Sequence, residues 1–224
     1  RKLRTSFTPP TFVQIGDQSF GQVTKAELDK LDTAWSDVSL DDAQDSLHNV
    51  EKAKTKLEAA KKTLQADGVQ FPIHLDLPVS STQTDFVRQA QSYKQSIEEA
   101  LGVENVVVDI QQVSDDELGS MTVLATSKDN IDWDINPNSG WSPDYADPST
   151  YLDAFDPTSG PTLLGALGIA PGSDSSAIKA VGLDKYKELL DDANSEKTDL
   201  EKRYSKYAKA QAWLTDSALV IPVH

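Results

Sequence analysis

The sequence predicts an α/β fold in which helices flank a sheet, organised as one domain over residues 1–224. Two observations support this prediction. Amphipathic helical patterns alternate with short extended runs from the middle of the chain onward, as in layered α/β structures. A chain of 224 residues with 38% hydrophobic content can also bury one substantial core, which makes two smaller domains the less favoured alternative.

The first predicted helix is followed directly by a strand. Apolar side chains recur at spacings of three and four from Val50 to Leu64, Asn49 is placed as the N-cap, and Gly68 follows as a stop signal. Residues 71–79 then read as an extended segment bounded by prolines.

A second helix and strand follow. Thr82 and Asp85 form a cap-like pair ahead of an amphipathic pattern that closes near Gly102. Residues 106–113 are apolar and extended in character, so they predict the next strand.

The sequence signals for the elements after residue 113 differ in strength. Residues 114–117 read SDDE, which fits a capping box and predicts a third helix reaching Ala125. Residues 132–135 form a third extended piece. Residues 156–183 are rich in glycine, serine and proline and have little period, which predicts irregular surface or a short helix.

A long helix is predicted near the end of the sequence, opened by residues 198–201 and leading to residues 218–221, and residues 221–224 read as an extended segment. Its apolar face carries Leu200, Tyr204, Tyr207, Ala208 and Leu214. The first fifty residues carry the weakest signal, with a possible helix over residues 25–35.

Charge and composition exclude several classes of function. The net charge is −15, from 36 acidic and 21 basic residues, so the chain offers no basic face for a nucleic acid. The absence of cysteine excludes disulfides, thiol nucleophiles and cysteine-ligated metal sites. No apolar run approaches the roughly 20 residues of a membrane span.

Residues 140–152, which read GWSPDYADPSTYL, combine aromatic, acidic and turn-forming residues without a helical or strand period. Pro143 and Pro148 each fix φ and stiffen the connection that carries Asp144 and Tyr145. A stiff acidic and aromatic loop suits capture of a cationic ligand. The alternative is a helix N-terminus capped by Asp147 or Ser149 and running through Phe155, which leaves Trp141, Asp144 and Tyr145 unexplained.

The pattern GWxxDYxDPSTYL resembles solute-binding proteins of oligopeptide ABC transporters, especially the AmiA/AliA-like lipoproteins of streptococci. The resemblance covers nearly the whole chain. Its further pieces are residues 1–10, 71–76, 106–112 and 208–214.

The resemblance implies a two-lobed, periplasmic-binding-protein-like fold of which residues 1–224 form the second lobe. Residues 1–12 are then expected to follow one crossing between lobes, and residues 218–223 to lead into the other. The implied function is binding of extracellular oligopeptides together with the first lobe, and their delivery to the membrane permease of an ABC importer. Such a protein is lipid-anchored at the extracellular face of the cell membrane, catalyses no reaction and needs no cofactor.

The resemblance also implies a set of ligand-binding residues. Asp144 is expected to accept the α-ammonium group of the peptide, which a carboxylate on a rigid loop does through a charge-assisted hydrogen bond. Trp141 is expected beside a pocket for a peptide side chain, with core packing as the alternative, and Gly140 belongs to the same set. Tyr145 either stacks on the ligand or supports the loop through its hydroxyl, and support is the favoured role.

Asn136 and Asn138 stand where some relatives carry a basic residue, which leaves open any preference for acidic peptides. Asp132, Asp134 and Asn136 superficially resemble the start of a calcium loop, but Pro137 replaces the required glycine, so no metal site is predicted.

Other chemistries fit less well. His48, His74 and His224 lack metal-ligand spacing, and a histidine in a strand, such as His74, is more often a satisfied structural residue. Four aspartates in the loop region invite comparison with paired catalytic carboxylates, but spacing alone does not establish such a pair. They are Asp144, Asp147, Asp153 and Asp156, of which Asp147 is better interpreted as a cap and the last two as solvated residues. The main competing function is an acidic extracellular module that contacts a partner protein and binds no small ligand.

Overall fold

The computed structural model describes residues 6–39, 48–137 and 140–221. The chain divides into two compact units. The first unit contains the described parts of residues 1–47, 140–163 and 169–224, and the second contains those of residues 48–139 and 164–168. The single domain expected from the sequence stays a prediction, because a compact unit is not by itself an independently folding domain.

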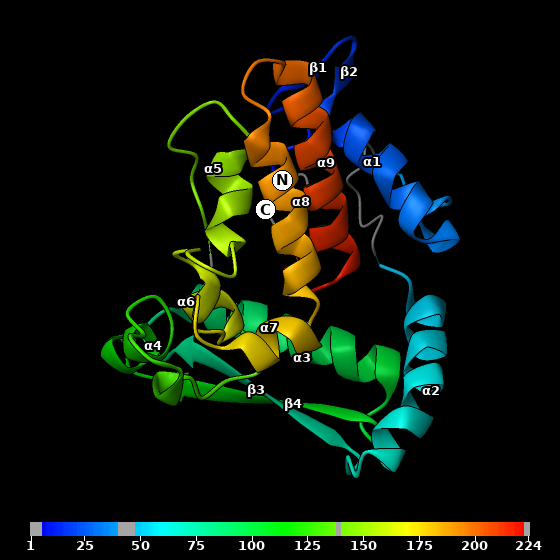
Figure 1. Cartoon of the computed structure of the whole chain (residues 1–224). Helices are drawn as coiled ribbons and strands as arrows, with labels where there is room; N and C mark the ends of the chain where they lie inside the picture. Colours follow the sequence, from blue (N-terminus) through cyan, green and yellow to red (C-terminus); the bar gives the residue numbers. More distant parts are fainter. Residues whose placement is uncertain (1–5, 40–47, 138–139, 222–224) are drawn as a thin grey trace. The chain divides into compact units, whose positions relative to one another are not determined.

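The second unit is built on a parallel β-α-β motif (Figure 1). Strands β3 (Ile73–Ser80) and β4 (Val106–Val113) pair in parallel, in step along their whole length. A parallel pair needs a long crossover, and α3 (Thr84–Leu101) supplies it. Both predicted strands and the helix between them are confirmed to within two residues. The buried core of this motif consists of Leu77, Val79, Ala90 and Val108.

Two further helices of this unit carry the expected caps. In α2 (Val50–Ala66) the Asn49 side chain accepts a hydrogen bond from the Lys52 N–H. In α4 (Asp115–Met121) the Ser114 side chain accepts from Glu117 in the same way. However, α4 ends at Met121 and does not reach Ala125. The backbone leaves helical geometry at the next residue, and the apolar pair that continues the period, Val123 and Leu124, is exposed.

Two local predictions in the second unit are wrong. Thr82 does not cap α3, whose N-cap residue Gln83 makes no side-chain capping hydrogen bond, and the Thr82 hydroxyl donates to Asp115 instead (2.9 Å). Residues 132–135 do not form a strand. The N–H groups of Asp134 and Ile135 both donate to the carbonyl of Asp76, so the segment runs beside β3 without forming a ladder. A short turn of 3₁₀ helix, η2 (Lys128–Asn130), precedes it.

The first unit is mainly helical. Helices α8 (Leu183–Ser195) and α9 (Leu200–Asp216) pack together, and α1 (Phe20–Leu31) packs on α9 (Figure 1). The helix predicted at residues 25–35 is present but begins earlier, at a capping box formed by Ser19 and Gln22. The smaller elements around it are β1 (Gln14–Ile15), β2 (Gln18–Ser19) and η1 (Thr33–Trp35).

Helix α8 was not predicted from the sequence. Its buried residues are Leu183, Tyr186, Leu190 and Ala193, and their spacings of three, four and three are those of one helical face. The preceding region contains the short helices α6 (Leu163–Leu167) and α7 (Ser175–Ala180), as one of the two sequence interpretations expected.

Helix α9 (Leu200–Asp216) confirms the predicted long C-terminal helix, with two corrections. Its cap is Asp199, whose side chain accepts from the Lys202 N–H. Leu200 is exposed because it lies in the first turn, outside the buried face formed by the later apolar residues. After the helix, Ala218 adopts a positive φ of 54° in a turn, and only Ile221 of the predicted extended segment 221–224 is described. Residues 222–224 lie outside the described part of the chain. Across the described ranges, no helix is both long and apolar enough to span a membrane.

Candidate functional site

The acidic and aromatic segment folds as an irregular loop followed by one turn of helix. Residues 140–148, here called the Trp141 loop, have no regular structure and lead into α5 (Ser149–Leu152) and η3 (Asp153–Phe155). All of these residues belong to the first unit. The sequence alternative of a short helix through Phe155 is therefore correct for the second half of the segment, while the first half is the shaped loop.

Thr150 organises the loop from its buried position in α5, where it is 4% exposed. Its backbone carbonyl accepts a hydrogen bond from the indole Nε1–H of Trp141. Its Oγ1 accepts from the backbone N–H of Asp144 (2.8 Å), and its own N–H donates to the carbonyl of Asp147 (3.0 Å). One threonine thus ties three separate points of the loop to the start of the helix.

The N-cap of α5 is Pro148, so neither Asp147 nor Ser149 occupies the capping position that the sequence predicted. Asp147, one residue earlier, binds Ser149 in the first turn of the helix. Its Oδ1 accepts from both the backbone N–H (3.0 Å) and the hydroxyl (2.6 Å) of Ser149. The hydroxyl of Tyr145 lies 3.3 Å from Ser149 Oγ, which matches the supporting role favoured for this tyrosine.

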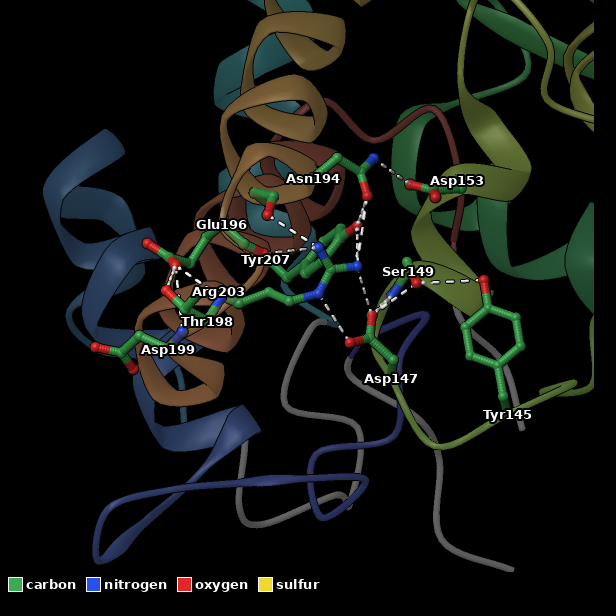
Figure 2. A network of polar contacts seen from close by, with 11 residues as sticks. Tyr145, Asp147, Ser149, Asp153, Asn194, Glu196, Thr198, Asp199, Arg203 and Tyr207 are labelled. Atoms are coloured by element: carbon green, nitrogen blue, oxygen red, sulfur yellow. Dashed lines mark hydrogen bonds and ion pairs between the residues drawn. The ribbon is translucent and has the colours of Figure 1, made fainter.

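The partner of Asp147 on α9 was not anticipated. Arg203 donates from Nε to Oδ2 (2.9 Å) and from Nη2 to Oδ1 (3.1 Å), a bidentate ion pair across 56 positions of sequence (Figure 2). The two side chains are 13% and 19% exposed. Burial alone would raise the pKa of Asp147, but the hydrogen bonds from Arg203 and Ser149 outweigh it and lower the pKa below its usual value. Asp147 is therefore ionised and held in place.

Arg203 is fixed from several sides. Its Nη1 donates to the carbonyls of Ala193 (3.1 Å) and Glu196 (3.3 Å), at the C-terminal end of α8. Its guanidinium lies 4.9 Å from the ring centroid of Tyr207, and Nη2 donates to the hydroxyl of the same residue (3.2 Å). Tyr207 in turn donates to Asn194 Oδ1 (2.6 Å). Figure 2 shows the continuous network that results, from the Trp141 loop to both long helices.

Asp153 lies at the far end of this network, where Asn194 Nδ2 donates to it (3.4 Å). Burial raises its pKa to about 6, and the nearby carboxylate of Asp156 adds to the shift. The sequence interpretation of Asp153 and Asp156 as solvated residues is wrong, because both are only partly exposed. Asp156 faces Lys187 at 3.8 Å.

The base of the site is an aromatic cluster. Tyr151 of α5 meets Phe7 and Phe12 edge to face, with ring centroids 5.9 and 5.1 Å apart. The buried hydroxyl of Tyr186, on α8, donates to the carbonyl of Leu152 (2.8 Å). These contacts seat α5 against the core of the first unit, so the loop is anchored on a packed element.

The predicted site residues differ in exposure. Trp141 is half-buried, whereas Asp144, Tyr145 and Gly140 are exposed. Within the described residues, no hydrogen-bond or ion-pair partner engages the Asp144 carboxylate. The structure brings Trp141 and Asp144 together on Thr150 and places Gly140 at the start of the loop, with open space around its Cα. Their role in ligand binding stays a prediction.

Comparison with known proteins identifies the family to which the chain belongs. The model of the family described as "Bacterial extracellular solute-binding proteins, family 5 Middle" matches residues 6–162, which include the Trp141 loop. The chain belongs to this family. The resemblance identified from the sequence is thereby confirmed.

Close relatives include three streptococcal proteins named as oligopeptide-binding proteins. The chain is 52% identical over 220 residues to AliA of Streptococcus pneumoniae serotype 4, 52% over 222 residues to SarA of Streptococcus gordonii and 48% over 220 residues to AmiA of Streptococcus pneumoniae serotype 4. These alignments cover 98–99% of this chain but only 33% of each relative. The chain thus spans about a third of the length of the relatives it matches.

Solved structures support the fold. A crystal structure of a peptide-binding protein of a peptide ABC transporter matches 99% of this chain and 78% of its own, with a TM-score of 0.66 at 20% identity. The pheromone receptor PrgZ matches 99% of this chain and 33% of its own, with a TM-score of 0.60 at 20% identity. The predicted α/β solute-binding fold is confirmed.

The remaining sequence candidates have structural roles in this family member. Asp134 accepts from the backbone N–H of Asp76 (2.9 Å), and Asn136 donates to the carbonyl of Gly165. His74 pairs with Asp109 across the two strands, Nδ1 to Oδ2, at 2.6 Å. The described residues contain no group of three histidine or acidic side chains placed to hold a metal ion. Asn138 and His224 lie outside the described residues.

Proposed function

We propose that this chain is the second lobe of an extracellular oligopeptide-binding protein that delivers peptides to the permease of an ABC importer. The observation that carries the proposal is the Asp144 carboxylate, which is exposed and has no partner among the residues that the structure describes, on a loop tied down at several points. The relatives named as oligopeptide-binding proteins support the same function.

In this proposal, Asp144 accepts the α-ammonium group of the peptide. An ion pair at an exposed site contributes little, because water screens both charges. When a first lobe closes over the peptide and excludes water, the same charge-assisted hydrogen bond becomes much stronger. Recognition of the amine therefore requires both lobes.

Trp141 supplies the apolar part of the proposed site. Its indole N–H is already used by Thr150, so its contribution to a ligand is the exposed part of its ring. Apolar burial is non-directional, which suits binding of peptides with varied side chains. Gly140 and Tyr145 complete the set, the glycine by leaving space beside the ligand and the tyrosine by supporting the loop.

The proposal places the intact protein, by which we mean this chain joined to its first lobe, at the extracellular face of the cell membrane, where a lipid anchor holds it. It acts by binding alone: no reaction is catalysed and no cofactor is required. The further partners are the permease and the first lobe, and the net charge of −15 disfavours nucleic acid.

Calorimetric titration of the intact protein with a mixture of short peptides tests this function. We expect saturable binding with every peptide recovered unchanged. Cleavage or modification of the peptides would favour an enzyme, and absence of both binding and turnover would favour the alternative of an acidic protein-interaction module. The same titration of the 224-residue chain should give much weaker binding, because half of a cleft leaves the peptide backbone in water.

A further inference from the structure

The ion pair between Arg203 and Asp147 connects the Trp141 loop to the helical core. Asp147 lies near the C-terminal end of the loop. Its carboxylate accepts hydrogen bonds from both Ser149 and Arg203. The remaining N–H groups of Arg203 donate to the carbonyls of Ala193 and Glu196, at the end of α8, and to the hydroxyl of Tyr207. One guanidinium therefore fixes three segments at once: the loop, the C-terminal end of α8, and α9.

We propose that Arg203 is a positioning residue for peptide recognition. Through Asp147 it holds the loop in the conformation that presents Asp144 and Trp141. This inference rests on the proposed peptide-binding function, but it concerns a side chain that itself has no need to touch the peptide, since its five N–H donors have partners within the protein.

The geometry explains why an arginine suits this position. A planar fork can bind both oxygens of one carboxylate in a fixed orientation, which a lysine ammonium cannot do. The distances of 2.9 and 3.1 Å from the guanidinium to the two Asp147 oxygens match such a fork. The position of the carboxylate in turn fixes the start of α5, where Thr150 receives the hydrogen bonds from Trp141 and Asp144.

The chain offers a matched control on the same helix. Lys206 lies one turn further along α9 and pairs with Asp192 of α8 at 2.7 Å, so it ties the two helices together without contacting the loop. Arg203→Met and Lys206→Met both remove one positive charge and the hydrogen bonds from that side chain to the C-terminal part of α8 and its cap. Only Arg203→Met removes the link to the loop. Asp147→Asn is a gentler second variant, because it keeps the shape of the side chain and an oxygen for Ser149.

Two readouts are compared at a temperature well below the unfolding transition of every variant. The first is exchange of the Trp141 indole N–H with solvent, followed by NMR in the 224-residue chain, whose four tryptophans give few indole signals. The second is the affinity of the intact protein for a short peptide with a free amine. For Arg203→Met and Asp147→Asn we expect exchange to accelerate and affinity to fall, each by roughly tenfold, within the range of coupling in one hydrogen-bond network. Lys206→Met should change neither by more than about threefold.

Arg203 would be only a structural residue if both loop variants kept Trp141 exchange and peptide affinity near the wild-type values, even with a lower melting temperature. Faster exchange with unchanged affinity would also overturn the inference, because binding would then not use the order of the loop. Failure of the wild-type intact protein to bind any peptide would instead overturn the proposed function. The two hypotheses therefore fail in different ways.

Discussion

The backbone N–H of Asp144 donates to Oγ1 of Thr150 over 2.8 Å, which ties an exposed residue to one that is only 4% exposed. The exposed carboxylate therefore sits on backbone whose position is set from inside the protein. A loop of this kind loses less conformational entropy on binding than a mobile one, because its order is already provided by the fold.

The Thr150 hydroxyl should accordingly affect binding without touching ligand. Thr150→Val keeps the side-chain shape and the backbone carbonyl that accepts from Trp141, but it removes the acceptor for the Asp144 N–H. We expect peptide affinity of the intact protein to fall about fivefold, since a neutral hydrogen bond contributes about 1 kcal/mol. Calorimetry gives the measurement, and Thr150→Ser, which retains the hydroxyl, is the control. An equal loss in both variants would show that the effect comes from altered packing at this position and not from the lost hydroxyl.

Trp141 should discriminate between peptides by the size of their side chains. Trp141→Ala removes apolar surface, so affinity should fall more for peptides with bulky side chains than for peptides of glycine and alanine, because about 25 cal/mol is lost per Å² of apolar contact. A matched pair of peptides that differ at one side chain, titrated into wild type and variant, measures this. The same loss for both peptides would indicate that Trp141 only shapes the loop through its bond to Thr150.

Sequence patterns predicted the β-α-β motif well because its elements depend on local signals. The strand periods, the apolar face of α3 and the stop at Gly102 are all contained within short stretches of sequence. The same rule fails for residues 132–135. They have no regular structure, and their hydrogen bonds to Asp76 depend on a contact with β3 that no local pattern encodes.

The candidate site was predicted only in part for the same reason. The loop residues stand together in one sequence motif, so the sequence alone singles them out, although the N-cap of α5 is Pro148 and not the predicted Asp147 or Ser149. Arg203 lies 56 positions away and has no local signal that distinguishes it from other charged residues of α9. The buried face of α8 appears in the sequence as regular apolar spacing from Leu183 to Ala193. The region before it is rich in glycine, which favours a prediction of irregular structure.

Asp153 should make stability depend on pH in a defined direction. Its pKa in the folded protein is about 6, above the roughly 3.9 of an unfolded aspartate. A raised pKa means that the folded state favours the protonated form, so this contribution to stability is full below about pH 4 and is lost as the pH rises through 6. Asp153→Asn removes the charge and keeps an oxygen for Asn194.

We therefore expect the difference in unfolding free energy between Asp153→Asn and wild type to move in favour of the variant from pH 4 to pH 7. The expected change is on the order of 1–2 kcal/mol, since one pKa unit corresponds to about 1.4 kcal/mol and partial exposure screens part of the shift. Urea denaturation of the 224-residue chain at several pH values measures it. Carboxylates that do not interact with Asp153 titrate alike in both proteins and cancel in the difference. A difference that stayed constant across this range would contradict the raised pKa.

Amine recognition by Asp144 gives the most direct test of the site. Asp144→Ala in the intact protein leaves the peptide ammonium without its partner in a closed cleft, a loss on the order of 2–5 kcal/mol, which corresponds to roughly thirtyfold weaker binding or more. Acetylation of the peptide amine removes the same interaction from the other side. Because the two groups are proposed to be in contact, the variant and the acetylated peptide together should cost little more than either alone. A purely structural Asp144 predicts the reverse: a lower melting temperature, with affinity retained and free and acetylated peptides bound equally well by the wild-type protein.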